Sequence, residues 1–354
     1  MNNSENLHHS SQPVADRLLA QIDELPNQLQ LAWEQGKRHP LPAWTGIRQV
    51  ILCGIGGSGV AGELLQAYAA SSSLVSMAVW RDYSLPAWAI GPETLVVILS
   101  HRGDEEEMLS ALGSAVERRC CCLAIGGGGT LARRAREAGV ACWLYPDEGL
   151  LYEPPAWMFG LTAAALYRLG LLADIGVEIH SAVEAMRQQQ SALKAEVPPS
   201  GNPARRMAGQ MMGRWVTIVG SGVLAPVARH WQYQIARLAK TWAQVEFLPE
   251  MDHTLLGSVL QPDGMLPATM IVFLRGMANP SRDRLRGNLT KQAFMLEGLG
   301  TDFVDILGDT PLAMLWAGVH YGDYTAYYLA LAYGIDPAPS PAIDQLKREL
   351  AASE

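Results

Sequence analysis

Two segments of the chain share the same order of a β-rich apolar run, a loop containing Gly-Ser-Gly and a helical pattern. They are residues 48–65, RQVILCGIGGSGVAGELL, and residues 214–231, RWVTIVGSGVLAPVARHW. This is a weak internal duplication. Around each copy, continuous apolar runs alternate with amphipathic helical patterns, which predicts parallel sheets covered on both faces. We therefore predict the α/β class, with two domains, each a parallel sheet flanked by helices in three layers, and an additional C-terminal helix.

The domain limits follow from breaks in this alternation. The stretch EVPPSGNP, residues 196–203, marks a connection between the two domains. Leu and Ile at helical spacing over residues 15–36 predict two helices, separated near Pro26. The predicted units are an N-terminal helical segment (1–38), a first domain (39–195), a linker (196–204), a second domain (205–336) and a tail helix (337–354).

Composition excludes several classes of function. The 354 residues are 49% hydrophobic and 18% charged, which is enough apolar material for two cores. A net charge of -8 without a Lys/Arg block argues against nucleic acid or an anionic membrane as a partner. The N-terminus lacks the apolar region of a signal peptide, and later apolar stretches are too short to span a bilayer, so we expect a cytoplasmic protein.

The five cysteines predict neither a disulfide framework nor a zinc site. Cys120, Cys121 and Cys122 are adjacent in an apolar run, which is typical of small residues in a buried strand. We expect no metal and no cofactor.

The first copy of the duplicated motif contains a loop of four glycines and one serine: Gly54, Gly56, Gly57, Ser58 and Gly59. Glycines let the backbone approach a ligand closely, and free N–H groups at the start of a helix attract phosphate. No P-loop Lys-Ser/Thr pair follows, and Ser100 stands where a dinucleotide site has an acidic residue. The loop predicts either a phosphate site outside these classes or a tight turn without a ligand.

Seven motifs along the chain, among them GIGGSGVAGELL, VILSHRGDEEEM, EPPAWMFG, PEMDHTLLG and IDPAPSPAIDQLKREL, have a recognisable order and spacing. In these motifs the chain resembles the bifunctional phosphoglucose/phosphomannose isomerases, which are two-domain members of the sugar isomerase (SIS) fold. The resemblance runs from about residue 40 to the C-terminus. It implies two SIS domains, interconversion of glucose 6-phosphate or mannose 6-phosphate with fructose 6-phosphate without added metal, and a homodimer whose active site is completed across subunits.

In that family two loops bind the sugar phosphate. The resemblance assigns substrate binding to Gly56, Gly57 and Ser58 in the first loop and to Ser100 in the second. Arg102, which replaces a serine of the family pattern, is a further candidate because a guanidinium binds phosphate through two hydrogen bonds.

The second loop also departs from the family pattern in its charge. Asp104 and Glu105 replace an asparagine and a threonine. A carboxylate about 5 Å from a phosphate costs roughly 3 kcal/mol at an effective dielectric constant near 20. Alternatively, residues 104–107 form the acidic first turn of a helix, where carboxylates interact favourably with the helix dipole. The two interpretations are compatible.

Two catalytic positions match the family and two do not. His253 matches the histidine assigned to ring opening, and Lys347 matches a C-terminal lysine that reaches the active site. Asp252 could orient the His253 imidazole. The resemblance places Arg237 at the glutamate that acts as base and Ala156 at the arginine that stabilises the enediolate. An arginine cannot act as a general base near neutral pH.

Other carboxylates in or near the motifs could act as base, but none is nominated, because proton transfer rarely survives misplacement of the base. Two hypotheses therefore stand. The chain is a hexose-phosphate isomerase, or it is a diverged SIS protein that binds a sugar derivative or a protein partner. The carboxylates considered were Glu63, Glu153, Glu246 and Glu250.

Overall fold

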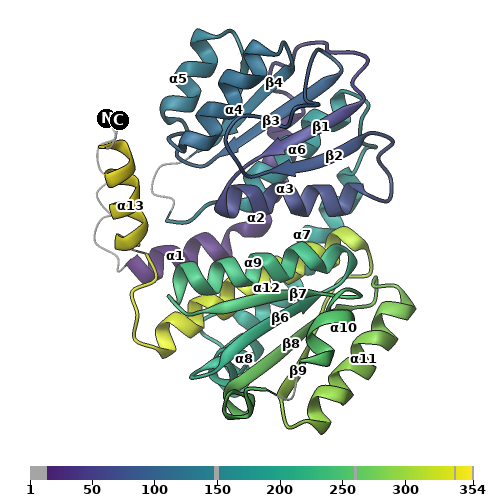
Figure 1. Ribbon diagram of the computed structural model, residues 1–354, viewed down its shortest axis with the longest axis vertical. Coiled ribbons are helices and arrows are strands. Elements are labelled where there is room, and N and C mark those ends of the chain that lie inside the picture. The colour runs from purple at the N-terminus through teal and green to yellow at the C-terminus, as the bar shows by residue number, and fades with distance from the viewer. Residues whose placement is uncertain (1–13, 147–150, 259–260, 339, 353–354) are drawn as a thin grey trace.

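The computed structural model describes residues 14–146, 151–258, 261–338 and 340–352. Within them the strands form two parallel sheets flanked by helices (Figure 1), which confirms the predicted α/β class with two sheets. The first sheet has the strand order β2-β1-β3-β4-β5 and the second has the order β7-β6-β8-β9. The predicted domain limits remain a proposal.

Strands and helices alternate through the first part of the chain. The strands of the first sheet are β1 (Gln49–Cys53), β2 (Ser76–Trp80), β3 (Thr94–Ser100), β4 (Cys121–Gly126) and β5 (Ala141–Leu144). The helices of this part are α1 (Val14–Asp23), α2 (Leu25–Gly36), α3 (Gly56–Ala69), α4 (Glu106–Glu117), α5 (Gly129–Glu137), α6 (Pro155–Arg168) and α7 (Gly176–Leu193).

The same alternation builds the second sheet. Its strands are β6 (Trp215–Gly220), β7 (Ala243–Phe247), β8 (Thr269–Gly276) and β9 (Gly300–Ile306). The α-helices are α8 (Pro203–Met211), α9 (Ala225–Leu238), α10 (Met251–Thr254), α11 (Ser281–Leu296), α12 (Pro311–Ala332) and α13 (Pro341–Ala351). Short 3-10 helices cover Gly222–Leu224, Leu255–Gly257 and Asp263–Ala268.

The strand order brings two loops together at the carboxyl edge of the first sheet. Strand β1 pairs with β2 on one side and with β3 on the other, so the connections that leave β1 and β3 diverge there. Ligands of open α/β sheets bind at such a divergence. Ser58, in the first turn of α3, and Ser100, the last residue of β3, both lie at this edge.

Helix α9 packs between the second sheet and α3, and α12 supports it from behind (Figure 1). Buried Asp323 of α12 accepts hydrogen bonds from His230 and Gln234 of α9, each at 2.7 Å. These contacts hold α9 in a fixed orientation. Helix α9 therefore presents one face toward the start of α3.

The structure differs from the sequence-based prediction in one strand. Strand β2 was not predicted, because it is a partly exposed edge strand with little apolar pattern. The predicted break near Pro26 is confirmed, since α1 ends at Asp23 and α2 begins at Leu25. In the described part of the chain, no helix is long and apolar enough to cross a membrane.

Candidate functional site

The first glycine loop turns directly into α3, and close contacts explain its glycines. Gly56 has a φ of +59°, a conformation that side chains rarely adopt. A Cβ atom on Gly57 would lie 2.7 Å from Oε2 of Glu153 and 3.1 Å from the Tyr233 ring. The loop is therefore covered by two side chains from distant parts of the chain.

Glu153 occupies the N-terminus of α3. Its Oε2 accepts hydrogen bonds from the backbone N–H of Ser58 at 2.7 Å and from the Ser58 hydroxyl at 3.3 Å. Burial raises the pKa of the Glu153 carboxyl, and the charge of Glu105 adds to this, whereas the Ser58 N–H, Tyr233 and Arg237 act in the opposite direction. The start of the helix thus already holds a carboxylate, and burial favours protonation of that carboxyl.

In the second loop, which follows β3, a serine hydroxyl also donates to a carboxylate of the chain. The Ser100 hydroxyl donates a short hydrogen bond to Oε2 of Glu105 and accepts one from the backbone N–H of Gly103 at 2.9 Å. Nζ of Lys347, from α13, lies 3.4 Å from Oε1 of Glu105. Lys347 therefore reaches the loop that the sequence assigned to phosphate binding.

The rest of the acidic run contacts the neighbouring helices. Oδ1 of Asp104 accepts a hydrogen bond from the backbone N–H of Thr130 at 3.1 Å, close to the start of α5. Glu106 and Glu107 lie in the first turn of α4, as the helix interpretation predicted. Arg102 is exposed, and its role in substrate binding stays a prediction.

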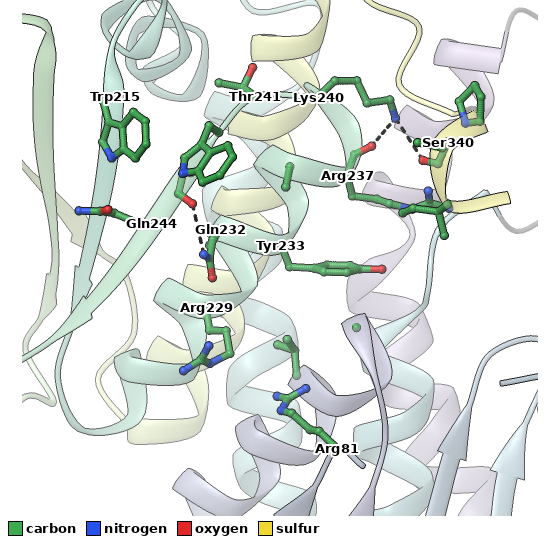
Figure 2. A pocket seen from close by; sticks show the side chains of 18 residues that line it. Arg81, Trp215, Arg229, Gln232, Tyr233, Arg237, Lys240, Thr241, Gln244 and Ser340 are labelled. Atoms are coloured by element: carbon green, nitrogen blue, oxygen red, sulfur yellow. Dashed lines mark hydrogen bonds between the residues drawn. The ribbon is translucent and has the colours of Figure 1, made fainter. Parts of the chain in front are cut away.

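A cleft of about 1150 Å³ opens beside the first loop (Figure 2). Tyr233 and Arg237 lie one turn apart on α9 and line it together with Gly56. The Tyr233 hydroxyl hydrogen-bonds with Glu153, and burial together with the Glu153 charge raises the pKa of the phenol. The Glu153 carboxylate therefore lies directly behind Gly56 and Tyr233, two residues of the cleft wall.

His253 is not brought to this cleft by its own chain. It is exposed on α10, next to the second sheet. The Asp252 carboxylate accepts hydrogen bonds from Arg286 at 2.6 Å and from Thr290 at 2.7 Å, so both of its oxygens have partners other than the imidazole. Ala156 is fully buried in α6 and its methyl group adds no polar function.

Sequence reasoning missed two residues of the site. Glu153 was considered as a base but not nominated, although it lies three residues before the unmatched Ala156. Tyr233 carried no motif signal; its place four residues before Arg237, on the same face of a helix, could have identified it. Among the described residues, no group of three His, Cys, Asp or Glu side chains could hold a metal ion.

The comparisons of sequence with known proteins agree on one family, and the comparison of structures agrees on the fold. Residues 200–350 match the family described as bacterial phospho-glucose isomerase C-terminal SIS domain. A bifunctional phosphoglucose/phosphomannose isomerase of Caldicellulosiruptor bescii is 30% identical over 93% of this chain and 98% of that protein. One from Aquifex aeolicus is 26% identical over 91% and 95%. The fold is similar to that of a hypothetical protein from Thermus thermophilus, with a TM-score of 0.71 and 16% identity over 98% and 92% of the two chains.

Proposed function

Because the chain belongs to the bifunctional phosphoglucose/phosphomannose isomerase family, we propose that it interconverts glucose 6-phosphate or mannose 6-phosphate with fructose 6-phosphate. The observation that supports this reaction is the Glu153 carboxylate, held on the first glycine loop beside an open cleft. A base that moves one proton between two neighbouring carbons needs this combination of fixed position and access.

In the proposed reaction, ionised Glu153 removes the C2 proton of the open-chain aldose. The C1–C2 double bond forms as the carbonyl electrons move to O1, which gives a cis-enediolate. The Lys347 ammonium would stabilise its negative charge. The protonated carboxyl then returns the proton to C1, O2 becomes the carbonyl oxygen, and the O2 proton passes to O1.

One observation favours a second candidate function. The hydroxyls of both serines assigned to phosphate binding already donate to carboxylates of the chain itself, Ser58 to Glu153 and Ser100 to Glu105. A site with this charge suits a neutral or cationic sugar derivative better than a phosphate. The second candidate is therefore a diverged SIS protein that binds such a sugar without converting it.

Two measurements on the purified full chain separate these functions. Product formation from fructose 6-phosphate, followed by NMR, supports the isomerase. Thermal shift with hexose phosphates, fructose and glucosamine identifies the class of ligand that binds. A neutral or cationic sugar that raises the melting temperature, without turnover of any hexose phosphate, supports the second candidate. No turnover and no thermal shift would reject both.

We further propose that the protein is a cytoplasmic homodimer in which His253 serves the site of the neighbouring chain. Exposure of His253 on α10 supports this arrangement. Mixing the inactive variants His253→Gln and Glu153→Gln should restore turnover if each site takes one residue from each chain, and should not if both residues act within one chain. Light scattering would report the oligomeric state independently.

A further inference from the structure

The charges around the cleft are divided between two ends. At the loop end, Glu153 and Glu105 hold the two serine hydroxyls. Along α9 the charge is opposite: among the described residues that line the cleft there are four cations and no carboxylate. The four are Arg81, Arg229, Arg237 and Lys240 (Figure 2).

Two of these cations have an ion-pair partner within the protein. Arg81 and Arg229 share Glu63, at N–O distances of 2.8 Å and 3.0 Å. The single carboxylate compensates one of their two charges, and both guanidinium groups are already hydrogen-bonded to it. Among the described residues, the other two cations of the cleft have no carboxylate in ion-pair contact.

Arg237, in the last turn of α9, and Lys240, just after it, have no carboxylate in ion-pair contact among the described residues, and the charges of Glu153 and Asp336 act on them from further away. The Lys240 ammonium donates to the carbonyl oxygens of Arg237 and Pro337, the second at 3.2 Å, and lies 3.5 Å from the Ser340 hydroxyl. Burial and the nearby Arg237 charge lower the pKa of Lys240. Nη1 of Arg237 is buried and has no hydrogen-bond partner among the described residues. An anion at this point would supply the missing acceptor and relieve the repulsion between two cations.

We propose that Arg237 and Lys240 form the anion subsite of this chain and that the sugar phosphate lies reversed relative to the family pattern. The family pattern places the phosphate at the two loops and the catalytic carboxylate at position 237. In this chain the carboxylate is at the loop and the cation is at position 237. The phosphate accordingly lies toward Lys240 and the C1–C2 end lies toward Glu153.

The geometry of α9 is compatible with this orientation. Tyr233, which hydrogen-bonds with Glu153, is four residues before Arg237, a rise of about 6 Å along the helix axis. That separation is of the order of the carbon chain between C2 and the phosphate-bearing end of a hexose 6-phosphate. The inference rests on the proposed function, because it takes a sugar phosphate as the ligand.

Calorimetric titration of the full chain with fructose 6-phosphate tests the subsite independently of turnover. Arg237→Gln should weaken binding at least about tenfold, since a charge-assisted contact is lost. Arg237→Lys should retain most of the affinity, which separates charge from packing. Ser58→Ala should change affinity less than about twofold, because its hydroxyl would not touch the phosphate. Arg133→Gln, an exposed arginine paired with Glu137, is the matched control.

The opposite pattern would overturn the inference: Ser58→Ala weakens binding tenfold and Arg237→Gln does not. The absence of measurable binding to the wild-type chain would overturn it as well. Wild-type binding that depends on Arg237, without any turnover, would support the subsite while rejecting the isomerase function. Melting temperatures without ligand show whether each variant is folded.

Discussion

The two copies of the glycine motif begin helices at equivalent edges of their sheets, yet different groups cover them. In the first copy, Ser58 donates to the carboxylate of Glu153, and the loop borders a cleft of about 1150 Å³. In the second copy, Ser221 is buried, and its carbonyl and hydroxyl oxygens both accept from the Asn279 amide at 3.2 Å. The cavity beside Ser221 is only about 20 Å³.

The comparison shows that the motif itself does not determine its use. Asn279 also accepts a hydrogen bond from the backbone N–H of Gly276 at 2.9 Å, so one neutral side chain joins the Ser221 loop to the end of β8. Glu153 places a charge on the first loop next to open space. This difference supports the proposal that the first glycine loop serves chemistry and the Ser221 loop serves stability.

The largest expected effect is on catalysis at the first loop. Glu153→Gln keeps the size and the hydrogen-bonding oxygen of the side chain but removes the base, so turnover of fructose 6-phosphate should fall by about 10²–10⁴. Glu246→Gln, a partly buried carboxylate of β7, is the matched control and should retain activity. A Glu153→Gln variant that works at the wild-type rate would remove Glu153 from the mechanism.

Substitution of Asn279, which holds the Ser221 loop, should lower the stability of the protein. Asn279→Ala removes the hydrogen-bond partner of the buried Ser221 hydroxyl and of the Gly276 N–H, so the free energy of unfolding should fall by about 1–3 kcal/mol. Asn288→Ala, on the exposed side of α11, provides the comparison and should cost much less. Denaturant titration measures both. If Asn279→Ala instead abolished sugar binding with unchanged stability, the assignment of a structural role to the Ser221 loop would be wrong.

The pH dependence of turnover provides a finer test. The pKa of Glu153 is raised, so the rate should fall as the pH decreases through a value above the ordinary 4.5 of a glutamate, where the base becomes protonated. The Glu105 charge contributes to this increase. Glu105→Gln should therefore move the acid limb of the pH–rate profile to lower pH. Glu106→Gln, in the same acidic run, should leave it nearer the wild-type position, and an upward shift for Glu105→Gln would contradict the coupling.

The smallest expected effect concerns the ion pair between Lys347 of α13 and Glu105 of the Ser100 loop. Lys347 is half-exposed, so Lys347→Gln should change the free energy of unfolding by less than about 1 kcal/mol. If Lys347 stabilises the enediolate, turnover in Lys347→Gln should fall by more than any loss of folded protein explains. Arg348→Gln, one residue further along α13, is the control. Equal activity in both variants would leave Lys347 with a structural role alone.

Much of the fold could be predicted because apolar runs and glycine loops have strong local patterns. The strand at residues 94–100 is apolar from Leu95 to Leu99 and fully buried, and α9 lies within the predicted helical pattern, two residues after its expected start. Strand β2 was missed because an edge strand has neither a continuous apolar run nor strict alternation. Pairing with β1 determines its structure, and that contact is not local in the sequence.

The site was harder to predict than the fold. The motifs predicted a role for Ser58, Ser100 and Lys347. In the structure Ser58 lies at the start of α3, Ser100 at the end of β3, and Lys347 contacts Glu105, to which Ser100 donates. They could not show that Glu153 lies on Ser58, because 95 residues separate the two and only the tertiary fold joins them. The value of Glu153 as a base depends on burial and on neighbouring charges, which a single sequence does not contain.

The most direct test of the account is a crystal structure of the Glu153→Gln variant with fructose 6-phosphate, because this variant should hold the sugar without converting it. We expect the sugar in the cleft beside the first glycine loop, with C1 and C2 next to residue 153 and the phosphate bound by Arg237 and Lys240. A phosphate bound by Ser58 and Ser100, or a sugar bound at Ser221, would contradict it.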